Sequence, residues 1–331
     1  MKRCKRCGLP ETFPGIKFDE EGICNFCRSY RGDEKLEKAM TKYRNKFDKL
    51  LEEKKRAGSY DALMAYSGGK DSSYTLKVLR EKYNLSILAL TMDNGFISPT
   101  TIENINNVVE KLGVDLIIYK PRFDILRTLF STAKDSDIYP RKTLERASTI
   151  CTTCMGIIKF ISLRLAIEKN IPFIAYGWSP GQAPVEASIF RNNPSMIRSM
   201  QKVLLEPMRK IVGDDILQYF LTEEHFTMED RFPYNVSPMA FLEYDEEKII
   251  KEIAELGWRK PDDTDPNSTN CLLNTFGIKI HRERLGFHPY AYELANLVRE
   301  GYMDRDEAVE RLETKEDERI LELVKKKLGI D

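Results

Sequence analysis

Short apolar segments alternate with amphipathic ones through the middle of this chain. Four apolar segments have the length of buried strands, at residues 61–67, 85–93, 114–121 and 171–177. Segments with apolar residues at helical spacing lie between them, at 72–83, 100–113 and 156–169. This alternation predicts βαβ units, and hence an α/β fold built on a doubly wound parallel sheet. Ligands of such a sheet bind beyond the carboxyl ends of its strands.

The flanking regions follow other patterns. Residues 33–57 are highly charged with apolar positions at helical spacing, which predicts a connecting helix with a solvated face. The segment 180–240 contains several prolines, and we interpret it as irregular loops and helices around the site. Residues 261–271 form a polar, turn-rich loop. Three segments predict a mostly helical C-terminal region, at 246–257, 291–312 and 316–329.

Composition narrows the class of protein. The 331 residues include 52 Lys and Arg against 52 Asp and Glu, so the formal net charge is zero and does not indicate a nucleic-acid-binding protein. A local basic patch would still be compatible with this total. We expect no membrane-spanning stretch of about twenty apolar residues and no signal peptide, which predicts a cytoplasmic protein with no membrane partner. Seven cysteines in a reducing compartment favour metal ligands or reactive thiols over disulfides.

Four cysteines stand in two closely spaced pairs near the N-terminus. Cys4 and Cys7 have two residues between them, as do Cys24 and Cys27. Two such pairs supply the four thiolates of a tetrahedral structural Zn²⁺ site of the zinc-ribbon type. A segment this short needs a metal to hold its fold, so zinc is favoured over a redox or cluster role.

The other three cysteines have a different arrangement. Cys151 and Cys154 are two residues apart, just before a predicted helix, and Cys271 lies far along the chain in the polar loop. Three thiolates bind a [4Fe–4S] cluster with one iron left open, which is able to carry sulfide or substrate. A persulfide-forming pair without iron and buried or structural-metal thiols remain as alternatives. Spacing does not determine whether Cys271 approaches the pair.

A glycine-rich turn follows the first predicted strand and precedes a predicted helix. It consists of Ser67, Gly68, Gly69, Lys70, Asp71, Ser72 and Ser73. Glycines let the backbone approach an anion, and the amides at the helix start then point at phosphate oxygens. Lys70 adds a positive charge, and the serine hydroxyls add donors. Asp71 is better suited to holding Mg²⁺ or orienting the loop.

The motif Ser-Gly-Gly-x-Asp-Ser resembles the PP-loop of the N-type ATP pyrophosphatases, and it differs from the Walker A pattern. The resemblance implies an adenine nucleotide alpha hydrolase-like fold, in which the loop binds the pyrophosphate end of ATP and the substrate becomes adenylated. It implies that Asp93, at the end of the second strand, meets ribose or adenine. A plain turn is the alternative at that position. Gly177, at the end of a later strand, is expected to form a wall of the same crevice, and no catalytic acid or base is evident there.

These features divide the chain into four predicted parts. They are a zinc ribbon at 1–32, a connecting helix at 33–57, a PP-loop ATP-binding domain at 58–215 and a helical C-terminal region at 216–331 that completes the site. In the phosphate loop we assign catalytic roles to Lys70 and Asp71, and among the later cysteines we assign them to Cys151, Cys154 and Cys271.

The chain resembles two groups of PP-loop enzymes. The ribbon, the loop, the close cysteine pair and the late cysteine resemble the iron–sulfur tRNA thiolases, whereas the first third of the chain looks closer to the N-acetyl sugar amidotransferases. Both resemblances imply that a substrate oxygen attacks the α-phosphate of ATP and that sulfur or ammonia then displaces AMP. We favour sulfur transfer, because ammonia chemistry has no use for the three thiolates. Amidation and a non-catalytic nucleotide-binding or redox-sensing protein are the alternatives.

The partners remain open at this stage. The substrate is a small molecule or tRNA, and the second partner is a sulfur donor or a glutaminase subunit. A homodimer stays among the options. The three histidines, His225, His281 and His288, are interpreted first as structural residues, with a role as acid, base or phosphate contact as the alternative. Arg282, Arg284 and Arg299 are interpreted as surface charges that are able to contact an anionic substrate.

Overall fold

The computed structural model describes residues 1–30, 32–54 and 58–330. Its centre is a six-stranded sheet with the order β3-β2-β1-β4-β6-β5. The four predicted strands are confirmed as β1 (Ala62–Ala65), β2 (Ile87–Met92), β3 (Asp115–Tyr119) and β4 (Phe173–Tyr176), all parallel to their neighbours. Their apolar runs are buried, except that β3, at the edge of the sheet, is partly exposed.

Two strands were not expected. β6 (Tyr234–Val236) continues the parallel arrangement beside β4, and β5 (Ile189–Arg191) closes the edge antiparallel to β6. The interpretation of 180–240 as loops and helices alone is therefore wrong, and the sheet is predominantly rather than wholly parallel. Each added strand has only three residues, too few for a period-two pattern to be recognised among the surrounding prolines.

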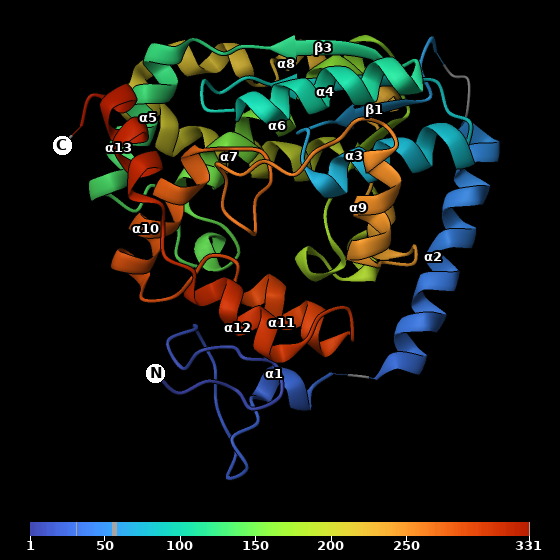
Figure 1. Ribbon diagram of the computed structural model, residues 1–331. Helices are drawn as coiled ribbons and strands as arrows, with labels where there is room; N and C mark the ends of the chain where they lie inside the picture. Colours follow the sequence, from blue (N-terminus) through green and yellow to red (C-terminus); the bar gives the residue numbers. More distant parts are fainter. Residues whose placement is uncertain (31, 55–57, 331) are drawn as a thin grey trace.

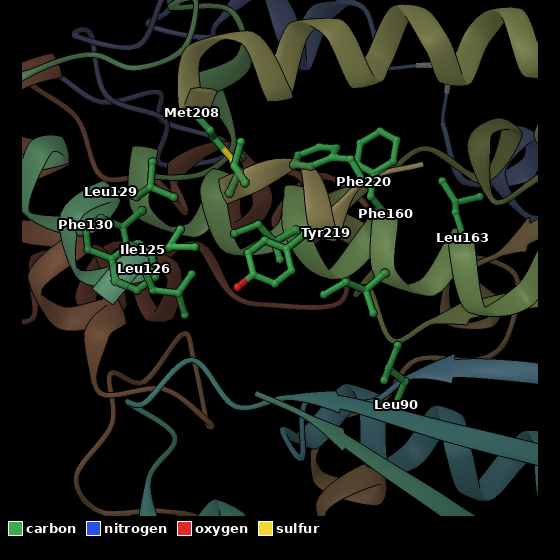
Figure 2. Packing of buried hydrophobic residues seen from close by; sticks show 14 of the residues in the cluster. Leu90, Ile125, Leu126, Leu129, Phe130, Phe160, Leu163, Met208, Tyr219 and Phe220 are labelled. Atoms are coloured by element: carbon green, nitrogen blue, oxygen red, sulfur yellow. The ribbon is translucent and has the colours of Figure 1, made fainter. Parts of the chain in front are cut away.

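Helices cover both faces of the sheet, as the doubly wound prediction requires. One face packs against α5 (Phe123–Asp135), α6 (Thr149–Glu168) and α7 (Pro194–Val212), whose apolar side chains meet those of the strands in the core that Figure 2 shows. The other face packs against α2 (Asp33–Lys54), α3 (Lys70–Lys77), α4 (Pro99–Leu112) and α9 (Glu246–Ala254). A π-helical turn, Val78–Lys82, continues α3. The predicted connecting helix corresponds to α2 over Asp33–Lys54, and its last predicted residues, 55–57, lie outside the described residues.

One helix of the described chain, α6, is long and apolar enough to cross a membrane by length and composition. The expectation that no such stretch exists is wrong in that respect. The helix contacts β1 and β4 of the sheet and neighbouring helices that include α5 and α7, and 61% of its most apolar window is buried inside the molecule. This burial is typical of the central helix of a doubly wound core.

The C-terminal region is helical, as predicted. After α8 (Glu223–Thr227) and α9 come α10 (Leu273–Leu285), α11 (Ala291–Arg299), α12 (Arg305–Glu313) and α13 (Glu318–Leu328). The pattern at 291–312 is thus two helices with a turn between them, where Gly301 has a positive φ of 78°.

The N-terminal segment lies far from β1–β3, beside α11 and α12 (Figure 1). It contains one short helix, α1 (Asn25–Arg28), and α2 then runs along the side of the molecule towards the sheet (Figure 1). The segment shares a separate apolar core with α11, formed around Leu9, Phe13 and Phe287. Phe13 stacks on Tyr292, with ring centroids 5.4 Å apart.

Candidate active site and metal sites

The phosphate loop joins β1 to α3, in the strand–turn–helix context that the sequence predicts. Gly68 has a φ of 75°, and a Cβ there would lie 2.5 Å from Ile105 Cγ1 and 2.7 Å from Thr101 Cγ2 on α4. Only glycine therefore fits this turn. Gly69 is the N-cap of α3 and offers no side-chain cap, so the positive end of the helix faces the site. In the structure, Lys70 N donates to Thr269 Oγ1 at 3.1 Å.

The predicted serines hold the loop together from within. Ser67 Oγ and Ser72 Oγ are 3.0 Å apart, and Gly69 N donates to Ser67 Oγ at 3.3 Å. Ser73 Oγ lies 3.1 Å from the hydroxyl of the buried Tyr66 at the end of β1. Gly177, after β4, packs on the backbone of the same helix, which brings the predicted wall of the crevice against the loop.

Lys70 is surrounded by acceptors. Its Nζ donates to Tyr244 Oη at 2.9 Å and pairs with Glu246 Oε2 at 2.9 Å and with Asp71 Oδ1 at 3.4 Å. Burial alone would lower the pKa of Lys70, but the charges of Asp71, Tyr244 and Glu246 outweigh it and raise that pKa, so the ammonium is firmly protonated. Glu246 also pairs with Arg311 on α12, Oε1 to Nη2, at 3.0 Å.

Asp71 lies in the first turn of α3, beside Lys70. Burial raises the pKa of its carboxyl, whereas Lys70 works against that shift. Its Oδ1 accepts a hydrogen bond from the Tyr244 hydroxyl at 3.3 Å. A carboxylate oxygen in this position is a suitable ligand for Mg²⁺ next to a bound polyphosphate.

A small cavity of about 60 Å³ opens in front of Lys70 and Asp71. Its walls come from α3, α9, α11, α12 and the segment 258–269. The C-terminal region therefore covers the phosphate loop. Trp258 fixes this cover, because its Nε1 donates to Gly68 O at 3.0 Å.

Glu293, on α11, is a cavity residue that the sequence did not single out. Its Oε1 accepts a hydrogen bond of 2.6 Å from Ser179 Oγ, in the turn after β4. Burial raises the pKa of Glu293 to about 7, and the nearby charge of Asp71 adds to the shift. A carboxyl that titrates near neutrality in a cavity beside a phosphate loop is suited to general acid–base work. Its sequence surroundings show only helical spacing, which gave no signal of this role.

Cys154 and Cys271 come together, and one buried amide joins them. Asn94, after β2, directs Nδ2 towards Cys154 Sγ at 3.7 Å and Cys271 Sγ at 3.4 Å. The chain around Cys271 is held there because Ile97 and Cys271 form a β-bridge and Leu272 N donates to Phe96 O at 2.9 Å. Sequence reasoning missed Asn94 altogether.

Cys151 lies one turn before Cys154, at the start of α6. Its N–H donates to the N-cap Ser148 Oγ at 3.1 Å, and its thiol donates to Asn274 Oδ1 at 3.4 Å. Burial raises the pKa of Cys151 to about 11 and raises the pKa values of Cys154 and Cys271 as well. Burial of this degree disfavours free thiolates, so an added cation or metal would be needed to keep these sulfurs ionised.

Tyr290 connects the cysteines to the cavity. It forms part of the cavity wall, and its hydroxyl donates to Asn274 Oδ1 at 3.2 Å, the same oxygen that accepts from Cys151. The amide nitrogen of Asn274 is buried without a hydrogen-bond partner. The cysteines therefore lie just beyond the wall of the cavity that Lys70 and Asp71 border.

The four N-terminal cysteines form a group that is able to hold a metal ion. The Sγ atoms of Cys4, Cys7, Cys24 and Cys27 all lie within 4.8 Å of one another, and all four residues are buried. Backbone amides support the sulfurs, since Cys24 N donates to Cys4 Sγ at 3.3 Å. Four converging thiols fit a tetrahedral zinc site.

Arg299 connects the N-terminal cysteine segment to α11, the helix that carries Glu293. This residue is buried at the end of α11, and its Nη1 donates to Cys7 Sγ at 3.2 Å. It is thus a charged partner of the cysteine group and not the surface charge that the sequence predicted. Arg282 and Arg284 pair with Glu316 and Asp137, each at 3.0 Å.

The remaining predicted residues have local partners. Asp93 Oδ1 accepts from Gly95 N at 2.8 Å, and its Oδ2 pairs with Lys120 at 3.0 Å, so its predicted contact with ribose or adenine stays a prediction. His225 caps α8 together with Thr222 and faces Glu168. Burial lowers the pKa of His281 to about 4 and that of His288 to about 3, which is typical of neutral structural histidines.

Comparison with known protein families supports the interpretation of residues 67–73 as a phosphate-binding loop. A family model, the phosphoadenosine phosphosulfate reductase domain, matches residues 61–225, from β1 through α8. Together with the Ser-Gly-Gly-Lys-Asp-Ser loop in its strand–helix setting, this match defines a nucleotide-binding domain of the PP-loop class. Residues 61–225 are therefore assigned to the PP-loop ATP pyrophosphatase superfamily.

Individual relatives are distant. An uncharacterized protein of Methanocaldococcus jannaschii is 26% identical over 320 residues, covering 94% of this chain and 93% of its own length. The argininosuccinate synthase of Dictyoglomus thermophilum is 26% identical over 211 residues, which are 60% of this chain and 48% of the synthase. The chain thus spans about half the length of that enzyme.

Two solved structures show weak overall likeness. The U34-tRNA thiolase of Methanococcus maripaludis with its [4Fe–4S] cluster is 18% identical, with a TM-score of 0.38 over 95% of this chain and 90% of that one. The NMN synthetase of Francisella tularensis is 12% identical, with a TM-score of 0.40 over 89% and 97%. TM-scores this low transfer neither activity nor residue roles to this chain.

Proposed function

We propose that this protein is an ATP-dependent adenylating transferase that replaces a substrate oxygen by sulfur. The observation that carries the proposal is the juxtaposition of two kinds of group at one cavity. Lys70 and Asp71 line it, and Cys151 is linked to the wall residue Tyr290 by two hydrogen bonds that meet at Asn274 Oδ1. A nucleotide site alone would not need three partly buried thiols at that place.

In the first half-reaction a substrate carbonyl oxygen attacks the α-phosphorus of ATP. An O–P bond forms, the bond to pyrophosphate breaks, and its electron pair leaves with pyrophosphate. Lys70 and the loop amides stabilise the charge that develops on the phosphates, and Asp71 is placed to hold the accompanying Mg²⁺. If the carbonyl belongs to an amide-like group, its N–H proton passes to Glu293, which leaves a neutral adenylated imidate.

In the second half-reaction sulfide attacks the activated carbon and AMP leaves with the former carbonyl oxygen. A [4Fe–4S] cluster held by Cys151, Cys154 and Cys271 would supply an open iron that binds sulfide. Asn94 would donate its amide hydrogens to two of the ligating sulfurs and so stabilise the negative charge of these thiolates. Tyr290 separates the two halves of the site and is placed to position the substrate between them.

The experiment compares two nucleophiles under anaerobic conditions. Iron-reconstituted protein is incubated with Mg-ATP and either sulfide with total tRNA or ammonia with nucleotide-linked N-acetyl sugars. AMP, pyrophosphate and labelled product are then measured. The proposal predicts sulfur incorporation that depends on Cys154 and survives in the matched control Met155→Leu, whose side chain is 44% exposed. Product formation with ammonia by Cys154→Ser protein would establish amidation instead, and absence of AMP in every arm would contradict a catalytic role.

A further inference from the structure

The carboxylate of Glu246 bridges two cations at the phosphate loop. One oxygen pairs with Lys70 Nζ at 2.9 Å, and the other pairs with Arg311 Nη2 at 3.0 Å. Glu246 belongs to the first turn of α9, whereas Arg311 lies on α12, near the other end of the chain. Both cationic side chains line the cavity in front of Asp71.

A phosphate group has the same chemistry as this carboxylate. Both present anionic oxygens to ammonium and guanidinium donors, and arginine in particular is favoured where phosphate is recognised. Burial would raise the pKa of Glu246, but Lys70 and Arg311 lower it overall, so the carboxylate is ionised while it bridges them. The position between Lys70 and Arg311 therefore selects for an anion.

We propose that Glu246 occupies the place of a nucleotide phosphate before ATP binds, and that ATP displaces it so that Arg311 becomes a second cationic ligand of the polyphosphate. The inference rests on the proposed function, because it requires ATP at this loop. It adds a phosphate ligand from the C-terminal region, outside the matched domain at 61–225.

Electrostatic balance gives the reason for displacement. With Glu246 and Asp71 in place, and with Glu307 also paired to Arg311, the charges of Lys70 and Arg311 are fully compensated. A polyphosphate entering beside an ionised Glu246 would be repelled by it, since like charges a few ångströms apart interact unfavourably. Moving Glu246 out of the bridge leaves Lys70 with Asp71 and Arg311 with Glu307, and it releases the donors of both cations that Glu246 occupied for the phosphates.

A structural role and a magnesium-binding role make different predictions. If Glu246 only ties α9 to α12, its loss lowers stability without strengthening nucleotide binding. If it holds Mg²⁺, its loss weakens the binding of Mg-ATP. Displacement by phosphate alone predicts that nucleotide binds more tightly once the internal competitor is removed.

The test is isothermal titration of the full-length protein with Mg-ATP and with inorganic pyrophosphate. We expect Glu246→Gln to tighten both affinities about tenfold, and Arg311→Gln to weaken both about tenfold, with partial recovery in Arg311→Lys. Glu307→Gln is the matched control, because Glu307 pairs with the same arginine at 2.5 Å from a position that is 46% exposed and outside the cavity. Its affinities should stay within about twofold of the original protein.

The outcomes separate the inference from the proposed function. Unchanged or weaker binding in Glu246→Gln would overturn the inference, provided that Lys70→Gln still weakens binding by at least about tenfold. Unchanged binding in both arginine variants would overturn the role of Arg311. Failure of the original protein to bind either probe, or full binding by Lys70→Gln, would instead remove the nucleotide site on which both proposals depend.

Discussion

Gly177 lies directly against Ser72. A Cβ added at Gly177 would stand 2.7 Å from Ser72 N and still closer to its Cα. The end of β4 and the start of α3 thus touch backbone to backbone, and this contact sets the height of the phosphate loop above the sheet. This close backbone contact requires a glycine directly after β4, because any side chain there would collide with Ser72. It accounts for the glycine without a direct contact between Gly177 and a ligand.

Gly177→Ala should therefore displace the phosphate loop. Because the clash is with backbone atoms and not with a flexible side chain, we expect a loss of about 1–3 kcal/mol in the free energy of unfolding. ATP affinity should fall with it. Gly156→Ala is the control, since a Cβ there meets only the side-chain ends of Met208 and Leu204, at 3.3 Å and 3.4 Å. Urea unfolding and ATP titration of both variants check this prediction, and an undisturbed Gly177→Ala protein would refute it.

Glu293 should make stability depend on pH. Because burial raises its pKa to about 7 from the ordinary value of 4.5 for a glutamate, the folded state binds its proton more tightly than the unfolded state does. Its contribution is fully present below the unfolded pKa and is lost as pH rises towards 7. Glu293→Gln should remove up to about 3 kcal/mol of that decline. Thermal unfolding from pH 4 to pH 8 measures it, and identical pH profiles for the two proteins would contradict the assignment.

Arg299 should help the ribbon keep its metal. Its guanidinium donates to Cys7 Sγ, so it favours the thiolate form that binds zinc. We expect Arg299→Met to lose zinc to a competing chelator at about tenfold lower chelator concentration. Arg28→Met serves as the control, since Arg28 belongs to the same segment but pairs with Asp19 at the surface. Equal zinc retention by the two variants would show that Arg299 only packs against the ribbon.

Asn94 should stabilise a metal cluster at the second cysteine group. Asn94→Leu removes the donor that reaches Cys154 and Cys271, and we expect iron to be lost to a chelator about tenfold faster. Asn107→Leu, on the outer side of α4, is the comparison, because its amide contacts only Gly257 O. Iron content and visible absorbance after anaerobic reconstitution give the result. Iron bound at the same level in Cys154→Ser protein would contradict the assigned ligand set.

Local features of the sequence predicted the central fold. The four long strands and the glycine turn were recognisable because each depends on residues adjacent in the chain, such as the apolar run from Ala62 to Ala65 followed by Gly68 and Gly69. β5 and β6 escaped prediction because three-residue strands acquire their structure from the neighbours with which they pair.

Features built by distant segments were harder to predict. The approach of Cys271 to Cys154 depends on the pairing of 97 with 271, a contact between loops that spacing does not encode. Glu293 and Arg311 lie on helices whose spacing indicates only amphipathicity, and their importance arises from the cavity that those helices close over Lys70. The paired cysteines were the exception, because metal-ligand spacing is itself a local signal.

The most direct test of this account is the affinity of the protein for Mg-ATP after a single change at the loop. Lys70→Gln should weaken binding by at least about tenfold, because it removes the buried cation that faces the polyphosphate. Lys77→Gln, in the same helix but paired with Glu81 and Glu252 away from the cavity, should bind as the original protein does. Equal affinities for the two variants would contradict the claim that ATP binds at this loop.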